Sequence, residues 1–132
     1  MPGSGMSAAE DYEYFLNSFL TLYRDHRDVL RFNQFFNVYV QSEEIAPEQM
    51  RPYMSMIGAL AERFHGVYEK GRRDGTLRTD LPERELFSTS LHLMLAAVTR
   101  YAVGLVYQGD SEPEQELLTL KRMLLHAYTA KA

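Results

Sequence analysis

Hydrophobic side chains recur at three- and four-residue steps along most of the chain, the spacing that gathers them on one face of an α-helix. The first helix is predicted from Ser7, which forms a capping box with Glu10 three residues later. A second helix is predicted over residues 29–40. A third follows Pro47, which suits a first helical turn, and has its clearest hydrophobic face over residues 50–68.

The last two predicted helices have broad hydrophobic surfaces. The fourth, over roughly residues 82–107, is hydrophobic on every side, and the fifth follows a second capping box, Ser111 with Glu114. Hydrophobic residues of the fifth helix span an arc of about 220°, whereas a one-sided helix needs a stripe of about 100°. No strand pattern competes with these helices, so we predict an all-α, five-helix antiparallel bundle.

The breadth of these two surfaces indicates a two-fold dimer. We expect the last two helices of each copy to form a four-helix bundle, because monomers avoid exposed hydrophobic patches of this size. The alternative is a monomeric bundle in which the last helix is deeply buried. In the dimer, the predicted interface residues are Leu105, Leu117, Leu120, Leu124 and Tyr128.

Length and composition narrow the class of protein. The 132 residues fit one domain, which we place at residues 7–132, with residues 1–6 as a flexible leader or an expression remnant. Cysteine is absent, which excludes disulfides and thiolate metal sites and favours the cytoplasm. With 14 basic and 18 acidic residues and no basic block, the chain lacks the charge of a nucleic-acid binder. Its longest hydrophobic tract is short for a membrane span.

Candidate catalytic chemistry is sparse. Glu62 and His65 have the Glu-x-x-His spacing of di-iron bundles, but those sites need two copies of the motif and only one is present. The other histidines, His26, His92 and His126, are not at metal-ligand spacing, and no phosphate loop or nucleophile elbow occurs. We therefore expect no catalysis, no cofactor and no metal. A metal- or cofactor-using helical-bundle enzyme is the principal alternative, and a helical protein-interaction module is another.

A polar edge on the fourth helix indicates a ligand pocket. Ser88, His92 and Thr99 line up along one side of an otherwise hydrophobic helix, where they would orient a small molecule. The alternative is an edge that faces solvent or is satisfied within the core. Aromatic and methionine side chains on the converging helices favour a cavity between them. The predicted ligand-binding residues are Phe19, Phe36, Asn37, Tyr53, Ile57, Phe64, His92, Thr99 and Tyr101.

The segment between the third and fourth helices carries the most specific pattern. Residues 70–78 read Lys-Gly-Arg-Arg-Asp-Gly-Thr-Leu-Arg, with Gly75 placed to end one helix and residues 80–82, Asp-Leu-Pro, to begin the next. This run resembles the C-terminal half of TetR-family transcriptional regulators, over about residues 7–130. The resemblance implies a homodimer that binds an apolar or amphipathic small molecule. It also implies contact with DNA only through an N-terminal helix-turn-helix domain that this chain lacks.

Overall fold

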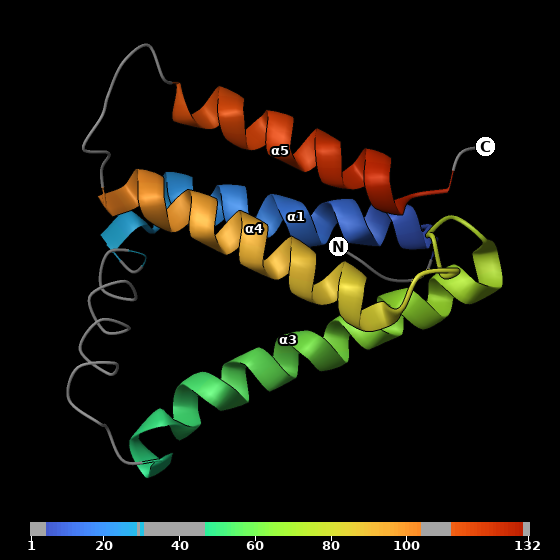
Figure 1. Ribbon diagram of the computed structural model, residues 1–132, viewed down its shortest axis with the longest axis horizontal. Coiled ribbons are helices and arrows are strands. Elements are labelled where there is room, and N and C mark those ends of the chain that lie inside the picture. The colour runs from blue at the N-terminus through green and yellow to red at the C-terminus, as the bar shows by residue number, and fades with distance from the viewer. Residues whose placement is uncertain (1–4, 29, 31–46, 104–111, 131–132) are drawn as a thin grey trace.

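The computed structural model of the chain describes residues 5–28, 30, 47–103 and 112–130. Within them lie four helices, α1 (Ala8–Asp25), α3 (Pro47–Asp74), α4 (Glu83–Val103) and α5 (Pro113–Tyr128) (Figure 1). The β-structure found in these residues is one isolated bridge between Leu77 and Thr129, so the prediction of an all-α fold is confirmed. The predicted second helix lies outside the described residues apart from Leu30, and the five-helix count stays a prediction. None of the described helices combines the length and apolarity needed to cross a bilayer.

The ends of the helices follow local signals in most cases. Ser7 accepts a hydrogen bond from the backbone of Glu10 at 3.1 Å and donates its own backbone N–H to the Glu10 carboxylate at 2.9 Å, so the first capping box is confirmed. Gly75, with φ of 74°, follows the last residue of α3 as predicted. The second capping box is wrong, because Pro113 occupies the first turn of α5 and Glu112 is its N-cap, with no side-chain hydrogen bond.

α1 is the central helix of the described bundle. It packs against α3, α4 and α5, while α4 also contacts α3 and α5. In Figure 1, α3 and α5 lie on opposite sides of the pair formed by α4 and, behind it, α1. The core is formed by the buried side chains that these faces bring together, chiefly Tyr12, Leu16, Phe19, Leu20, Tyr23, Phe64, Tyr68, Leu86, Leu91, Met94, Val98, Leu117, Leu124 and Tyr128.

α5 buries most of its hydrophobic arc within the chain itself. Leu117, Leu124 and Tyr128 are 1%, 4% and 7% exposed, and Leu120 is partly buried. The inference that one copy cannot cover this arc is therefore wrong for these side chains, because α1 and α4 both pack against α5 and cover it from two directions. Leu105, the remaining predicted interface residue, lies outside the described residues.

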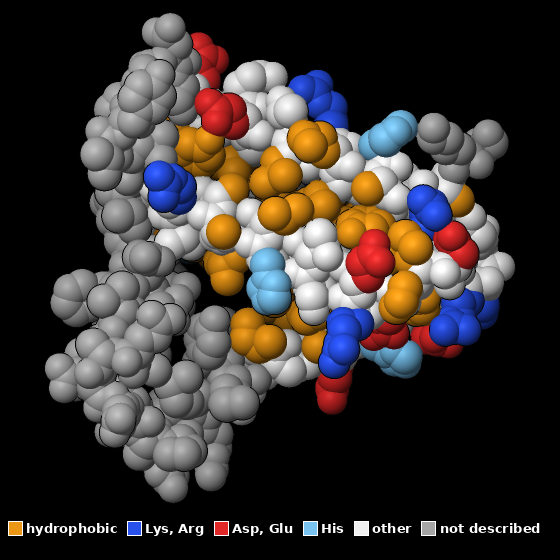
Figure 2. All heavy atoms as spheres, in the orientation of Figure 1, with side chains coloured by type: hydrophobic (Ala, Val, Ile, Leu, Met, Phe, Trp, Pro, Cys, Tyr) orange, Lys and Arg blue, Asp and Glu red, His pale blue; other side chains and the backbone are white. Residues whose placement is uncertain are grey.

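One side of α4 carries an exposed hydrophobic side chain that the described residues of this copy do not cover. Met94 and Val98 are fully buried, whereas Leu93 is 45% exposed. Among the described helices, α1, α3 and α5 pack against α4. Met123 of α5 is 62% exposed, and Figure 2 shows hydrophobic side chains gathered over α4 and α5 on the face in view. The uncovered hydrophobic surface is therefore different from the one predicted.

Candidate functional site

Two of the predicted ligand-binding residues belong to a tightly packed aromatic core. The ring of Phe15 lies 5.4 Å from that of Phe19 and 5.5 Å from that of Phe64, and Phe64 lies 5.5 Å from Phe87. Tyr12 closes the group at 6.1 Å from Phe64 in an edge-on contact. These spacings are those of aromatic rings in direct contact. Phe19 and Phe64 therefore fill the space between α1, α3 and α4; we call this group of five rings the aromatic core.

The other predicted ligand-binding residues of α3 and the second helix are less informative. Ile57 is partly buried and packs against the core. Phe36, Asn37 and the side chain of Tyr53 lie outside what the structure describes. Near the end of α4, the Tyr101 ring lies 6.5 Å from that of Tyr23, and its hydroxyl donates to the Glu116 carboxylate of α5.

The polar edge predicted on α4 divides into two environments. His92 is exposed to solvent, which favours the alternative of a solvent-facing edge at this residue, and its role in ligand binding stays a prediction. Thr99 is only 7% exposed, and its hydroxyl has no hydrogen-bond partner among the described residues. Ser88, at the start of the edge, is partly buried. A buried hydroxyl without a hydrogen-bond partner is rare and destabilising. Thr99 is therefore the residue of this edge whose hydroxyl would gain most from a hydrogen bond to a ligand.

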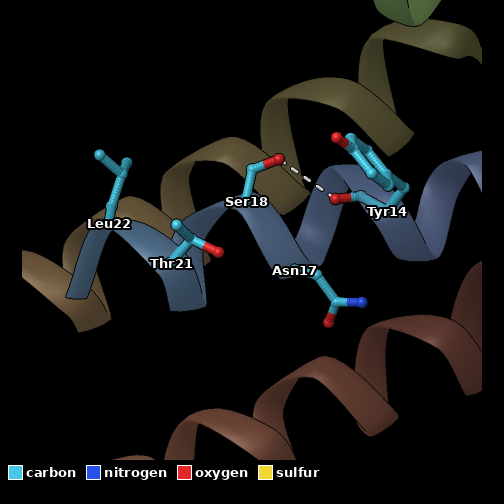
Figure 3. Close-up of a pocket in the computed structure, with 5 residues that line it drawn as sticks. All are labelled: Tyr14, Asn17, Ser18, Thr21 and Leu22. Carbon is cyan, nitrogen blue, oxygen red and sulfur yellow. Dashed lines mark hydrogen bonds between the residues drawn. The ribbon is translucent and has the colours of Figure 1, made fainter. Parts of the chain in front are cut away.

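A shallow pocket of about 380 Å³ lies along the outward side of α1, where sequence reasoning did not place one. In Figure 3, Ser18 donates its hydroxyl to the backbone carbonyl of Tyr14 at 3.1 Å, and Asn17 points toward α5. The Asn17 side-chain oxygen accepts a hydrogen bond from Lys121 at 3.0 Å. The remaining lining residues, Thr21 and Leu22, continue the same face of the helix. Polar residues at helical spacing are typical of a solvent-facing side, so the pattern carried no signal for a pocket.

Residues 70–82, which we call the junction, do more than connect two helices. The Asp74 carboxylate accepts a hydrogen bond from the backbone N–H of Ala8 at 2.8 Å, and the Thr76 hydroxyl accepts one from the backbone N–H of Ala9 at 2.9 Å. Asp74 also accepts bonds from the backbone and hydroxyl of Thr76, at 2.9 and 2.8 Å. The junction thus satisfies backbone donors in the first turn of α1 that no helix can satisfy by itself.

The charge of Asp74 is stabilised by this arrangement. Desolvation raises the pKa of its carboxyl, but the hydrogen bonds from Ala8 and Thr76 and the nearby Lys70 outweigh that effect and lower the pKa below its usual value. A carboxylate at the start of a helix is also favoured by the helix dipole. Asp74 therefore acts as a second, tertiary cap of α1 beside Ser7.

A partly buried ion pair fastens α3 to the same turn of α1. The Lys70 ammonium lies 2.5 Å from the Asp11 carboxylate and donates to the backbone carbonyl of Met6 at 3.3 Å. Asp11 is only 5% exposed, and its other carboxylate oxygen has no partner among the described residues. Removing either member would leave a charge in a poorly hydrated place.

The junction also pairs with the chain that follows α5. Arg78 donates its backbone N–H to the carbonyl of Tyr128 at 2.8 Å, and Ala130 donates to the carbonyl of Thr76 at 2.8 Å. In Figure 1, the start of α1, the end of α3, the start of α4 and the end of α5 come together at the right of the view. Residues 70–82 are therefore in contact with every described helix at one end of the bundle.

One buried hydrogen bond joins α1 to α4 inside the bundle. The hydroxyls of Tyr12 and Ser90 are 2.6 Å apart, and both residues are fully buried. Burial raises the pKa of Tyr12 well above its ordinary value, although the bond to Ser90 opposes that shift. Tyr12 is therefore neutral at physiological pH and serves as a structural hydrogen-bonding group.

Comparison with known proteins identifies no relative of this chain: no protein-family model, curated protein or solved structure matches it. The resemblance to TetR-family regulators consequently rests on the pattern of the junction and the order of the helices.

Proposed function

We propose that this chain is the effector-binding and dimerisation domain of a bacterial TetR-like transcriptional regulator. It would be a cytoplasmic, non-catalytic domain that binds an apolar or amphipathic small molecule. The observation that carries this proposal is the buried Thr99 hydroxyl on α4, which has no partner among the described residues. Since a polar group in a small-molecule site orients an otherwise hydrophobic ligand, Thr99 fits that role.

Without a ligand, the buried Thr99 hydroxyl stays unpaired among the described residues, which costs stability. An unpaired buried hydroxyl destabilises a protein by about 1–3 kcal/mol, which a ligand's hydrogen-bonding group would recover. The neighbouring Val98 and Ala102 are buried and hydrophobic, so the rest of such a ligand would be apolar. This combination favours an amphipathic molecule with one hydroxyl, carbonyl or carboxyl group over a highly charged one.

The junction supports a route by which ligand binding would act on α1. α4 begins directly after the junction, and the junction caps the first turn of α1 through Asp74 and Thr76. In TetR-like regulators the DNA-reading domain precedes the ligand-binding half. A ligand that shifts α4 would therefore change how the start of α1 is held, and coupling of this kind is typically worth about 1–3 kcal/mol.

The dimer is proposed on the open face of α4 and α5. Leu93 and Met123 are large, exposed hydrophobic side chains on two helices that pack against each other. A second copy on this face would cover both residues and complete a four-helix bundle. In this arrangement, Leu117, Leu124 and Tyr128 support the interface from within the core and make no contact across it.

The ligand proposal is tested by pairing Thr99→Val with Thr89→Val, a change of the same kind on the same helix. Replacing the unpaired hydroxyl of Thr99 by a methyl group should raise the melting temperature of the ligand-free protein. It should also weaken amphipathic ligands found by thermal shift by about tenfold, the value of one hydrogen bond of about 1.4 kcal/mol. A panel of lipophilic alcohols and acids that never shifts the wild-type melting temperature would contradict the proposal.

The dimer proposal is tested by sedimentation of the wild type, Leu93→Glu, Met123→Glu and Tyr14→Glu. The wild type should sediment as a dimer, and either charge on the open face should give monomers. Tyr14 is also an exposed hydrophobic residue, at 48%, but it lies on α1, so its substitution should leave the dimer intact. A wild-type monomer at high concentration would exclude this interface.

A further inference from the structure

Three potential metal ligands meet where α3 passes the start of α4. His65 and Glu69 are one turn apart on α3, and Glu83 is the first residue of α4. One nitrogen or oxygen atom from each residue lies within 4.8 Å of the other two. His65 Nδ1 and Glu83 Oε1 are 2.8 Å apart. His65 and Glu83 are 18 residues apart in the sequence, so no local spacing motif predicts that they form a cluster.

The fold fixes the positions from which these ligands extend. Tyr68, on the same stretch of α3, is 2% exposed and donates its hydroxyl to the backbone carbonyls of Thr79 and Leu81, at 3.1 and 2.5 Å. Leu77 is buried and packs closely against Gly71. These contacts hold the start of α4 against α3, so the carboxylate of Glu83 reaches His65 without any rearrangement of the backbone.

We propose that His65, Glu69 and Glu83 form a binding site for a divalent transition-metal ion, best suited to Zn²⁺. One imidazole nitrogen and two carboxylate oxygens are ligands that zinc accepts, with water completing the coordination. In a tetrahedral site with metal–ligand distances of about 2.1 Å, ligand atoms lie about 3.4 Å apart. The observed separations, 2.8 Å between His65 and Glu83 and at most 4.8 Å for the other pairs, are close to that value. The two carboxylates also neutralise the charge of the ion.

One neighbouring side chain would have to give way. Arg72 lies 3.1 Å from the Glu69 carboxylate and would release it to the ion. The same guanidinium lies 5.2 Å from the centre of the Tyr68 ring, so it keeps a cation–π partner after that release. The bound ion would link α3 to α4 directly beside the junction. This site does not depend on the proposed ligand pocket or on the dimer.

The site is tested by isothermal titration of the metal-free chain with Zn²⁺ and by melting temperature with and without the ion. The wild type should bind one ion with micromolar affinity and melt at a higher temperature when loaded, and EDTA should reverse both effects. His65→Ala and Glu83→Gln should each weaken binding by at least about tenfold, since changes even outside the first ligand shell cost that much. The His65 side chain is 61% exposed, so its substitution should not disturb folding.

Matched controls are His92→Ala on α4 and His126→Ala on α5, two exposed histidines outside the cluster. Both should bind Zn²⁺ like the wild type. The proposal is overturned if the wild type binds Zn²⁺ only at millimolar concentration. It is also overturned if His65→Ala binds as tightly as the wild type, or if a control variant loses the ion equally. Circular dichroism of each metal-free variant establishes that any loss of binding occurs in a folded protein.

Discussion

The aromatic core and the junction connect overlapping sets of helices by opposite means. The aromatic core joins α1, α3 and α4 through ring contacts between 5.4 and 6.5 Å, with little directional bonding. The junction joins the start of α1 to the ends of α3 and α5 through hydrogen bonds of 2.8 to 2.9 Å close to solvent. Ring packing tolerates small changes in direction but depends on filled volume. Hydrogen bonds depend on the identity of single atoms. We therefore expect the aromatic core to supply most of the stability and the junction to fix how the helix ends are aligned.

The largest effect is expected from emptying the aromatic core. Phe64 is 1% exposed and contacts three other rings, so Phe64→Ala should lower the free energy of unfolding by about 3–5 kcal/mol. Urea denaturation measures this loss. Arg63→Ala, an exposed neighbour on the same helix, should change the free energy by less than about 0.5 kcal/mol. A small loss for Phe64→Ala would show that the rings are not the main source of stability.

The ring of Tyr12 packs in the aromatic core, and its hydroxyl forms a hydrogen bond to Ser90 of α4. Substitutions at Tyr12 can therefore test ring packing and hydrogen bonding separately. Tyr12→Phe keeps the ring but leaves the buried Ser90 hydroxyl without its partner, which should cost about 1–3 kcal/mol. Adding Ser90→Ala removes the second hydroxyl and should restore part of that loss. A double-mutant cycle measured by chemical denaturation gives the coupling energy. Additive effects would contradict a direct bond.

A pair of glycines on α3 compares close packing at the junction with open surface. A Cβ atom on Gly71 would lie 2.9 Å from the Leu77 Cβ, so Gly71→Ala should destabilise the protein by about 1–2 kcal/mol after the gain in helix propensity. Gly66 has nothing within 4 Å of the same position, and Gly66→Ala should stabilise by about 0.4–1 kcal/mol. Opposite signs in thermal unfolding would confirm the close approach. Equal signs would contradict it.

A smaller effect than that of the core is expected from one capping carboxylate, and it depends on pH. Asp74→Asn should cost about 1 kcal/mol at neutral pH, the usual value of a helix cap. Since hydrogen bonding lowers the pKa of Asp74, its contribution is present above the unfolded-state pKa of about 3.9 and is lost as the pH falls through the lower folded-state pKa. Wild type and variant should therefore differ in urea midpoint at pH 6 and converge in strong acid.

Asp80→Asn is the matched control for that measurement. Asp80 also lies in the junction, but its carboxylate pairs with the exposed side chain of Arg78, at 2.8 Å, and does not cap α1. Exposed ion pairs contribute little to stability, so its neutral-pH loss should be smaller. Amide hydrogen exchange at the first turn of α1 should increase in Asp74→Asn and remain unchanged in Asp80→Asn. Equal exchange in both variants would exclude the tertiary cap.

Local signals predicted the framework well. Ser7 and Glu10 start α1, and Gly75 ends α3 in the left-handed conformation, because caps and turns involve atoms only a few residues apart. At α5 the predicted N-cap was wrong by one residue: the N-cap is Glu112 and not Ser111, because Pro113 occupies the first turn. On the predicted ligand edge of α4, periodicity aligned His92 with Thr99. It could not tell which of them a neighbouring helix would cover.

The amino-acid sequence by itself determined that the chain is helical and where most described helices begin and end, since hydrophobic period and capping act over a few residues. Tertiary structure decided which hydrophobic surface remains open. Leu117 and Leu124 are buried, whereas Leu93 and Met123 are exposed, because burial depends on which helix packs alongside. It also decided that Asp74 and Thr76 cap α1 from more than 60 residues away, and that His65 meets Glu83. Such contacts depend on the mutual orientation of whole helices, which no local pattern encodes.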